Sequence, residues 1–500
     1  MINRMKIGQW FLPVLLSIGF GACESFLDVK PKAQIKSDAL FETEQGFKDA
    51  LIGVYIGMGD PFAYGKEMTL GMMDVLAQQY EMYTGNEYYE LSVYGYNSAM
   101  ARIDNIWYQL YNCIANLNNL LENIDRQKKL LHPAHYAMIK GEALGLRAFL
   151  HFDILRIWGF GDMQQHPEYG DRYTIPYQLK YHKSLLPQFT QKEVLAMIHK
   201  DLNEAEILLN AYDPWGVAPK GTDYVLPNED KFYTHRRCHF NYQAVKATQA
   251  RVCLWESDFG EALACAQIVI ACQGELYPWI TDDKISINDV KKKDLSFSSE
   301  HIFQLNILDM YENFKWNLRL KAADDLNINY NGFYLSPQRA NECFEVPGIG
   351  SSDYRYLHHF DNRDSKWAFL KFAEVDGYRY GNMMPLIRIS EMYYIIVECL
   401  LNDRKPESLR QAVKCLNTVR SHRGITAVLP ETLTLQEVGE KLEKEYRKEF
   451  ISEGQLFFYY KRRGQTVIPG GVQTMDDKAY RLPFPEVEME FGNREDYRQK

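Results

Sequence analysis

The segment KGEALGLRAFLHFDILRIWG, residues 140–159, decides the fold. Apolar residues recur along it at spacings of three and four, from Ile139 to Ile157, so they form a continuous stripe on one face of an α-helix. Good helix formers fill the segment, no proline interrupts it, and Gly159 and Gly161 end it. The sequence therefore predicts a packing helix that stops just before the first of these glycines.

The polar side chains of this helix admit two interpretations. One is a solvated face with contacts between residues four apart, and the other is a catalytic cluster. Because charged side chains are mostly exposed in folded proteins, we interpret them as surface residues. They are Arg147, His151, Asp153 and Arg156.

The composition is that of a large globular protein. Of the 500 residues, 46% are hydrophobic and 25% are charged, which is enough apolar material for a substantial core. After the first 22 residues, no apolar run approaches the roughly 18 residues that a membrane-spanning helix needs. Lys and Arg total 57 against 66 Asp and Glu, a formal net charge of −9, and the basic residues form no stripe. Nucleic acid is therefore not an expected partner.

The N-terminus has the pattern of an export signal followed by a lipid anchor. Arg4 and Lys6 precede a short apolar stretch, residues 10–20. The sequence Phe-Gly-Ala-Cys, which ends at Cys23, resembles a bacterial lipobox, in which the leader is cut before the cysteine and its thiol is lipidated. A plain secretory signal with an incidental cysteine is the alternative. Glu24 follows in place of an aspartate, so no inner-membrane retention signal is present and the outer membrane is the predicted location.

These observations divide the chain into three parts. Residues 1–22 are predicted to be a lipoprotein signal peptide. Residues 23–36 are predicted to be an extended, lipidated tether, because Pro31 opposes a helix there. Residues 37–500 are predicted to form a single domain, with an N-terminal half to about residue 215 and a C-terminal half, which carries ligand-loop insertions, from about residue 216.

Helical periodicity recurs in pairs along the rest of the chain. Residues 104–158, 191–257 and 386–422 each contain two helical stretches joined by a turn or loop. A pattern of Asp-Phe-x-x-Ala-x-x-x-Ala starting at Asp258 resembles a tetratricopeptide repeat. The irregular spacing of the pairs is typical of a repeat solenoid with large insertions. The predicted fold is all-α, a tetratricopeptide-like scaffold of helical pairs with long loop insertions.

Two insertions that interrupt the helical pattern, residues 57–100 and 275–335, are the predicted ligand-binding segments. Long insertions in a helical protein often carry function, and aromatic rings with a polar edge suit sugars and peptides equally. For each residue taken singly, the alternative is an aromatic side chain that only fixes its loop onto the core. The candidate ligand-binding residues are Tyr80, Tyr83, Asn86, Tyr88, Tyr89, Trp279, Trp316, Arg319 and Tyr330.

No catalytic or metal-binding pattern is recognisable. Pairs of adjacent aspartates occur at 282–283, 324–325 and 476–477. The side chains of neighbouring residues point in different directions, whereas glycoside hydrolysis needs two carboxyl groups that face one substrate. Residues 235–239 include two histidines and a cysteine, but two arginines among them oppose a cation. The eight cysteines after Cys23 show no C-x-x-C spacing, and we interpret them as buried free thiols. We expect no enzyme activity and no metal or other cofactor, with calcium left open by the sequence.

The segment GEALGLRAFLHFDILRIWG resembles the signature helix of the SusD/RagB family. Residues 23–31 resemble the family's usual start, C-x-x-FLD-x-x-P, and four segments further along resemble other motifs of the family, so the resemblance runs from Cys23 to Asn493. The chain departs from the family at Tyr446, where arginine is usual, and at Tyr459-Tyr460, which replace Asp-Leu. These departures predict either that the helix carrying them packs differently or that the chain belongs to a divergent branch of the family. The four segments are RISEMYYIIVECL at 388–400, LNTVRSHRGI at 416–425, EYRKEFISEGQLFFYYKRRG at 445–464 and YRLPFPEVEMEFGN at 480–493.

The resemblance implies a function. Members of this family are surface lipoproteins of the Bacteroidetes outer membrane that capture nutrients without catalysis. They deliver oligosaccharide, or less often peptide, to a SusC-like TonB-dependent transporter. A hydrolase of the same locus and a scaffold that binds only protein are the alternatives. No motif of the resemblance carries ligand-binding residues onto this chain, so the identity of the ligand stays open.

Overall fold

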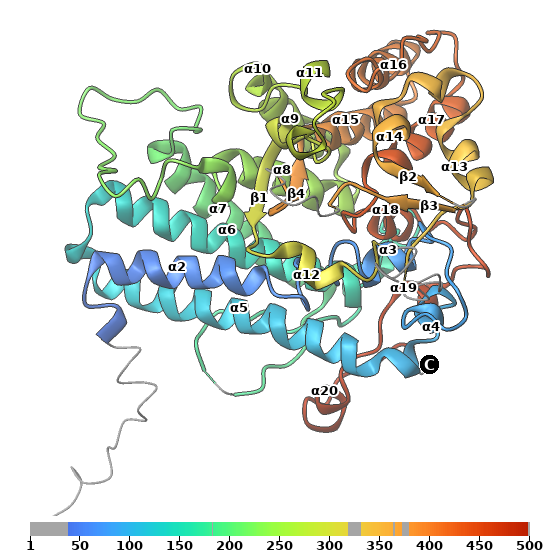
Figure 1. Ribbon diagram of the computed structural model, residues 1–500. Coiled ribbons are helices and arrows are strands. Elements are labelled where there is room, and N and C mark those ends of the chain that lie inside the picture. The colour runs from blue at the N-terminus through green and yellow to red at the C-terminus, as the bar shows by residue number, and fades with distance from the viewer. Residues whose placement is uncertain (1–38, 183, 319–331, 364–365, 373–379, 499–500) are drawn as a thin grey trace, which may run out of the picture.

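The protein is an assembly of packed helical pairs (Figure 1). The computed structural model describes residues 39–182, 184–318, 332–363, 366–372 and 380–498. In this part of the chain, helices predominate and the strands form two small antiparallel sheets. The all-α, tetratricopeptide-like fold predicted from the sequence is confirmed.

The bounds of the longer helices agree closely with the periodic segments of the sequence. None of the described helices is both long and apolar enough to cross a membrane. The longer helices are α2 (Glu44–Met58), α5 (Met100–Arg126), α6 (Pro133–Trp158), α7 (Gln191–Tyr212), α8 (Tyr242–Glu256), α9 (Phe259–Ala271), α15 (Ile389–Asp403), α16 (Pro406–Ser421) and α17 (Leu435–Glu449). The shorter ones used below are α3 (Met72–Leu76), α4 (Tyr89–Ser92), α10 (Gln273–Leu276), α11 (Asp282–Ile285), α12 (Met310–Phe314), α13 (Pro337–Phe344), α14 (Tyr354–His358) and α18 (Leu456–Arg462).

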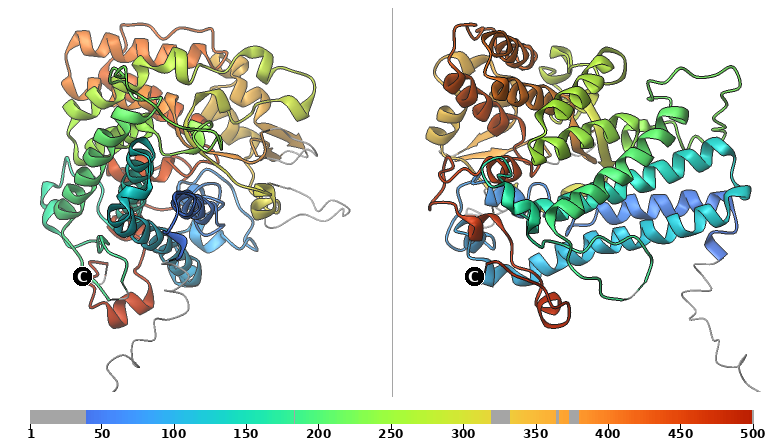
Figure 2. Two further views of the ribbon diagram at one scale, coloured as in Figure 1. Left: turned by 90° about the vertical axis from the view of Figure 1, so that its left-hand side faces the viewer. Right: turned by 180° about the vertical axis from the view of Figure 1, so that it is seen from behind.

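The three predicted helical pairs are present. Helix α5 packs on α6, α7 on α8, and α15 on α16. Further contacts between α6 and α7 and between α9 and α15 join the pairs into one stack, and Figure 2 shows α5, α6 and α7 running side by side from behind. One hydrophobic cluster extends through the stack, from Phe41 to Phe484.

The strands connect the stack to its insertions. Strand β1 (His301–Asn306) pairs antiparallel with β4 (Met383–Arg388), which leads directly into α15. Strand β2 (Phe360–Arg363) pairs antiparallel with β3 (Lys366–Phe369). Both sheets therefore fix the segments that lie between α9 and α15, where the sequence has no helical period.

Helix α6 lies in the centre of the stack and is buried on every side, rather than on one stripe. Every residue from Gly141 to Trp158 is buried. A Cβ atom at Gly145 would lie 2.5 Å from the Phe240 ring, so this glycine permits the close approach of the loop that precedes α8. A helix packed on all faces is typical of the interior of a large protein.

The prediction that the polar residues of α6 form a solvated face is wrong. Arg147 donates from Nε and Nη2 to the two carboxylate oxygens of Asp201, both at 2.7 Å. Asp153 accepts a hydrogen bond of 2.6 Å from the Tyr64 hydroxyl and pairs with Arg156. Each charge is buried with a partner from a distant segment or the same helix, and periodicity alone does not reveal such partners.

A buried network of ion pairs holds the C-terminal helices together around Glu449, at the end of α17. Arg355 Nη1 and Arg423 Nε lie 2.7 and 3.0 Å from Glu449 Oε2, and Arg388 Nη2 donates to the Glu449 carbonyl at 2.6 Å. These side chains are at most 1% exposed. Burial by itself raises the pKa of a carboxyl, but the guanidinium groups of Arg423 and Arg388 hold the pKa of Glu449 well below its usual range.

Residues of three of the sequence motifs meet in this network. Glu445, one turn before Glu449, also accepts from Arg355, and Glu453, four residues after Glu449, also accepts from Arg388. Arg388 opens the segment RISEMYYIIVECL, and Arg420 and Arg423 lie in LNTVRSHRGI. The motifs are therefore separate in sequence but meet at one set of charges.

The departures from the family pattern lie against each other. Tyr446 and Tyr459 stack with ring centroids 4.2 Å apart and planes 27° apart. The Tyr446 hydroxyl donates to Glu398 Oε1 at 3.0 Å. Two aromatic rings thus meet at the positions where the family pattern has an arginine and an aspartate.

We expect Glu449→Gln to destabilise the fold by about 3–5 kcal/mol, because three buried guanidinium groups lose their shared countercharge. Urea unfolding followed by circular dichroism measures this change. The matched control is Glu440→Gln on the exposed side of α17, for which the free energy of unfolding should change by less than about 0.5 kcal/mol. Equal effects of the two substitutions would contradict the central role of the network.

Candidate functional site

The two predicted ligand-binding insertions lie side by side. The Glu81 amide donates to the Tyr334 carbonyl at 2.8 Å, which forms a β-bridge between the first insertion and the end of the second. On its other side the second insertion bridges to β3, where Leu335 pairs with Trp367. Residues more than 200 positions apart in the sequence therefore form one surface near α4 and β3 (Figure 1).

The inner layer of this site consists of buried rings. Tyr80 stacks on Phe333 at 4.8 Å, and Tyr88 meets the same ring edge-on at 5.3 Å. Tyr80 is 4% exposed and Tyr88 is fully buried. In this structure, neither ring presents a face that a ligand could reach.

The hydroxyl groups of the inner rings are bonded to buried carboxyl groups. Tyr80 donates to Asp74 at 2.7 Å, and Tyr88 donates to Glu67 at 2.7 Å. Asp74 also accepts from the Gly454 amide at 2.8 Å, and burial raises its pKa to about 7. Tyr80 therefore links the first insertion to the segment between α17 and α18.

The outer layer, which we name the tyrosine platform, consists of Tyr83, Tyr334 and Lys366. The two rings are 5.2 Å apart, and the Lys366 ammonium lies over them at 3.8 and 4.3 Å from their centroids. Lys366 also donates to the Tyr83 hydroxyl. All three side chains are half-buried, and burial raises the pKa of Tyr334. The platform thus presents aromatic surface together with a cation, held in place by the inner layer.

Asn86 shapes the turn beside the platform. Its side-chain Oδ1 accepts from the Tyr88 backbone amide at 2.8 Å, and its backbone amide donates to the Tyr83 carbonyl at 2.9 Å. Its Nδ2 is buried and has no acceptor among the described residues. Tyr89, the next candidate in this turn, is half-buried at the start of α4.

The remaining candidates are distributed unevenly. Trp316 follows α12 and is 51% exposed. The carbonyl of the next residue, Asn317, accepts from the Phe333 amide at 2.8 Å. This hydrogen bond places Trp316 near the inner layer. Trp279 lies elsewhere, between α10 and α11, and stacks on His422 at 4.7 Å. Arg319 and Tyr330 lie outside the described residues.

Tyr334 and Lys366 were not among the residues predicted from the sequence. Tyr334 lies in the aromatic run Gly-Phe-Tyr-Leu-Ser-Pro just before α13, a signal that could have identified it within the predicted insertion. Lys366 lies beyond both predicted insertions, and only the pairing of β3 with Leu335 brings it to the rings. No local pattern indicates that pairing.

The residues with metal-binding side chains at 235–239 are used in other ways. Arg236 donates to Glu142 and Asp213 at 2.7 and 2.8 Å, and His239 lies 2.9 Å from Glu142. Elsewhere in the described chain, His199, Cys253 and Glu256 lie close enough to hold a metal ion. There, His199 Nε2 is 2.5 Å from Glu256, and burial raises the pKa of the Cys253 thiol, which opposes thiolate ligation.

Sequence comparison places this architecture in a family. A family profile described as starch-binding associating with outer membrane matches residues 25–214, and the profile of the SusD family matches residues 327–497. The chain belongs to the SusD family. The match to SusD-like protein P25 of Formosa agariphila is 25% identical over 218 residues and covers 42% of this chain but only 39% of that protein. SusD-like protein P38 of the same organism is 22% identical over 211 residues, which are 39% of this chain and 36% of that protein.

Solved structures of the SusD superfamily show the same fold. A SusD superfamily protein from Bacteroides vulgatus is 18% identical, with a TM-score of 0.68 over 91% of this chain and 98% of that one. A SusD-like carbohydrate binding protein from the same organism is 18% identical, with a TM-score of 0.65 over 90% of this chain and 96% of that one. Because both sequence identities are 18%, these structures show that the fold is shared and no more than that.

We expect Tyr88→Ala to destabilise the protein by about 3–5 kcal/mol, because it removes a fully buried ring and leaves Glu67 without its tyrosine donor. Thermal and urea unfolding measure the effect. Tyr181→Ala, at an exposed tyrosine far from the site in sequence, is the control and should change stability by less than about 0.5 kcal/mol. A Tyr88 variant as stable as the control would show that the inner layer is dispensable for folding.

Proposed function

We propose that the protein binds oligosaccharide at the tyrosine platform, without catalysis. Membership of the SusD family, together with the matching family profile described as starch-binding, supports a sugar ligand. The observation that carries the proposal is the convergence of the two insertions on Tyr83 and Tyr334. Ring faces stack on the apolar face of a sugar, while polar groups at their edges select its orientation.

The polar groups around the platform suit sugar hydroxyl groups. Lys366 supplies donors above the rings. Trp316 adds a half-exposed ring at the edge of the second insertion. A bound oligosaccharide would therefore meet two or three rings and a small number of fixed donors, which is typical of small-ligand sites.

The wider role that we propose is delivery of the captured oligosaccharide to a SusC-like TonB-dependent transporter in the outer membrane. The family profile that matches residues 25–214 is described as associating with outer membrane, which supports this location. In this proposal, residues 1–22 are the signal peptide, Cys23 carries the lipid, residues 23–36 form the tether, and residues 37–500 form the surface-exposed domain.

Titration calorimetry with a panel of glycans and peptides tests the binding proposal. We expect heat without product for one class of oligosaccharide. Tyr83→Ala, Tyr334→Ala and Trp316→Ala should each weaken binding by roughly 1–3 kcal/mol, because few anchor residues dominate such sites. Their melting temperatures should change little.

Tyr181→Ala serves again as the control and should bind as the wild type does. Product formation in the reaction mixture would favour a hydrolase, and binding restricted to peptides would change the ligand class. Large losses of melting temperature in the platform variants with unchanged affinity would show that these rings belong to the core and that the site lies elsewhere.

Lipid anchoring is tested by Cys23→Ala. We expect the variant to fold normally and to move from the membrane fraction to the soluble fraction, because the lipid provides the anchoring. Cell fractionation followed by a salt wash, with a Cys415→Ala variant as control, measures the distribution. A Cys23 variant that still sediments with outer membranes after the wash would contradict lipid anchoring as the means of attachment.

A further inference from the structure

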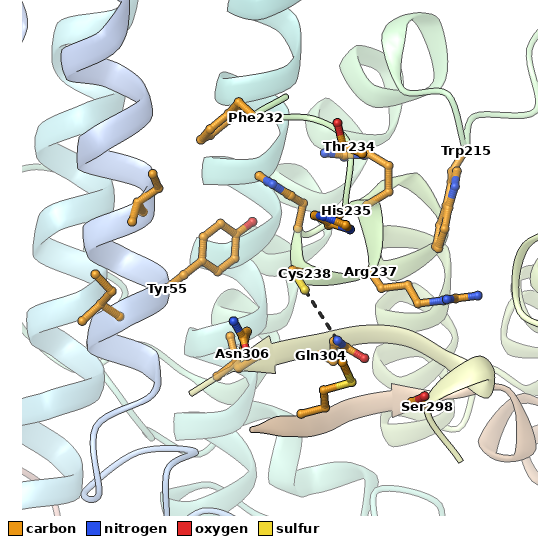
Figure 3. Close-up of a pocket in the computed structure, with 16 residues that line it drawn as sticks. Tyr55, Trp215, Phe232, Thr234, His235, Arg237, Cys238, Ser298, Gln304 and Asn306 are labelled. Atoms are coloured by element: carbon orange, nitrogen blue, oxygen red, sulfur yellow. Dashed lines mark hydrogen bonds between the residues drawn. The ribbon is translucent and has the colours of Figure 1, made fainter. Parts of the chain in front are cut away.

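A second concave site lies away from the platform, between α2 and the β1–β4 sheet. This α2–β1 pocket is a cavity of about 700 Å³, a size typical of small-ligand sites. Figure 3 shows Trp215 and Arg237 at one end, Tyr55 and Asn306 at the other, and Gln304 between them. None of the platform residues lines it.

The charges that line the pocket are all of one sign. None of its lining residues is acidic, although the whole chain carries a formal net charge of −9. Two of its basic residues are neutralised, because Arg236 pairs with Glu142 and Asp213, and His239 lies against Glu142. Arg237 is different, since it makes no ion pair within the described part of the chain.

The Arg237 guanidinium is held in place without being neutralised. Its Nη2 donates to the Leu276 carbonyl at 2.7 Å, whereas its Nε is buried and finds no acceptor among the described residues. Burial lowers its pKa, and the nearby Asp294 carboxylate is itself buried and bonded to Ser298. A positive charge in this position is stabilised by an anion that enters the pocket.

The other walls suit a sugar ring. Trp215 is half-buried and lines the same end of the pocket as Arg237 (Figure 3). The exposed Asn306 supplies an amide group, and Ile56, which is 71% exposed, forms an apolar rim. Gln304 is buried, with its amide bonded to Cys238 and His301. Aromatic surface, an amide group and one uncompensated cation match a sugar that carries an oxyanion.

We propose that the α2–β1 pocket binds an acidic sugar unit, with its carboxylate or sulfate group on Arg237 and its ring against Trp215. This site goes beyond the proposed function, because it is separate from the tyrosine platform and adds selectivity for charged glycans. A neutral sugar lacks the group that Arg237 recognises.

Titration calorimetry with three probes tests the proposal on the full chain without its leader: trigalacturonate, a sulfated trisaccharide and maltotriose. We expect at least one acidic probe to bind the wild type. The Arg237→Gln substitution should weaken the binding of this probe by about tenfold or more and leave the melting temperature of the protein unchanged. Arg126→Gln, at an exposed arginine of α5, is the control and should bind as the wild type does. Tyr83→Ala should retain this binding, so failure of the platform and failure of the pocket are distinguishable.

Salt dependence gives a second measurement that requires no variant. Rising sodium chloride should weaken the binding of the acidic probe to the wild type, because ions screen its attraction to Arg237, and it should leave neutral binding unchanged. The proposal is overturned if neither acidic probe binds, if maltotriose competes equally for the same site, or if a folded Arg237→Gln variant binds the acidic probe as the wild type does.

Discussion

The carboxylate of Glu449 is the group on which the arrangement of the C-terminal helices depends. Guanidinium groups from three separate segments reach it, namely Arg355 of α14, Arg388 at the end of β4 and Arg423 after α16. A buried charge is tolerated only when it is paired and hydrogen-bonded, so each arginine must occupy one position relative to α17. The network therefore fixes the relative positions of these segments more tightly than apolar contacts alone would.

This constraint extends to the tyrosine platform through a short chain of contacts. The segment after α17 carries Gly454, whose amide donates to Asp74, and Asp74 accepts from the Tyr80 hydroxyl. Tyr80 stacks on Phe333, next to the platform residue Tyr334. A platform supported by rigid, buried contacts loses little entropy when it binds a ligand, which favours affinity.

The two candidate sites differ in their aromatic and charged groups. The tyrosine platform offers stacked rings under one ammonium group, whereas the α2–β1 pocket offers a guanidinium group with no acidic residue in its lining. They lie on different segments of the chain. Residues near position 83 and strand β3 contribute to the tyrosine platform, whereas α2 and β1 contribute to the α2–β1 pocket. A glycan-capture protein with both sites could distinguish neutral from acidic stretches of one polymer.

Sequence patterns alone were enough to predict the longer helices and the family. Helical periods, caps such as the Thr190 capping box, and motifs at 140–159 and 388–464 depend on local spacing, and local spacing is visible in one dimension. The sequence also located the two insertions that carry Tyr83 and Tyr334, because the loss of helical period is itself a local signal, whereas Lys366 lies outside both insertions.

Only the tertiary structure decided the roles of individual side chains. Arg147 and Asp153 have the sequence pattern of surface residues but are buried, because their partners lie on other segments. Tyr83 and Tyr88 are five positions apart in the same loop, yet one is half-exposed on the platform and the other is fully buried against Phe333. The physical reason is that burial and pairing depend on contacts between distant residues, and no local pattern of polarity encodes which distant residue a side chain will meet.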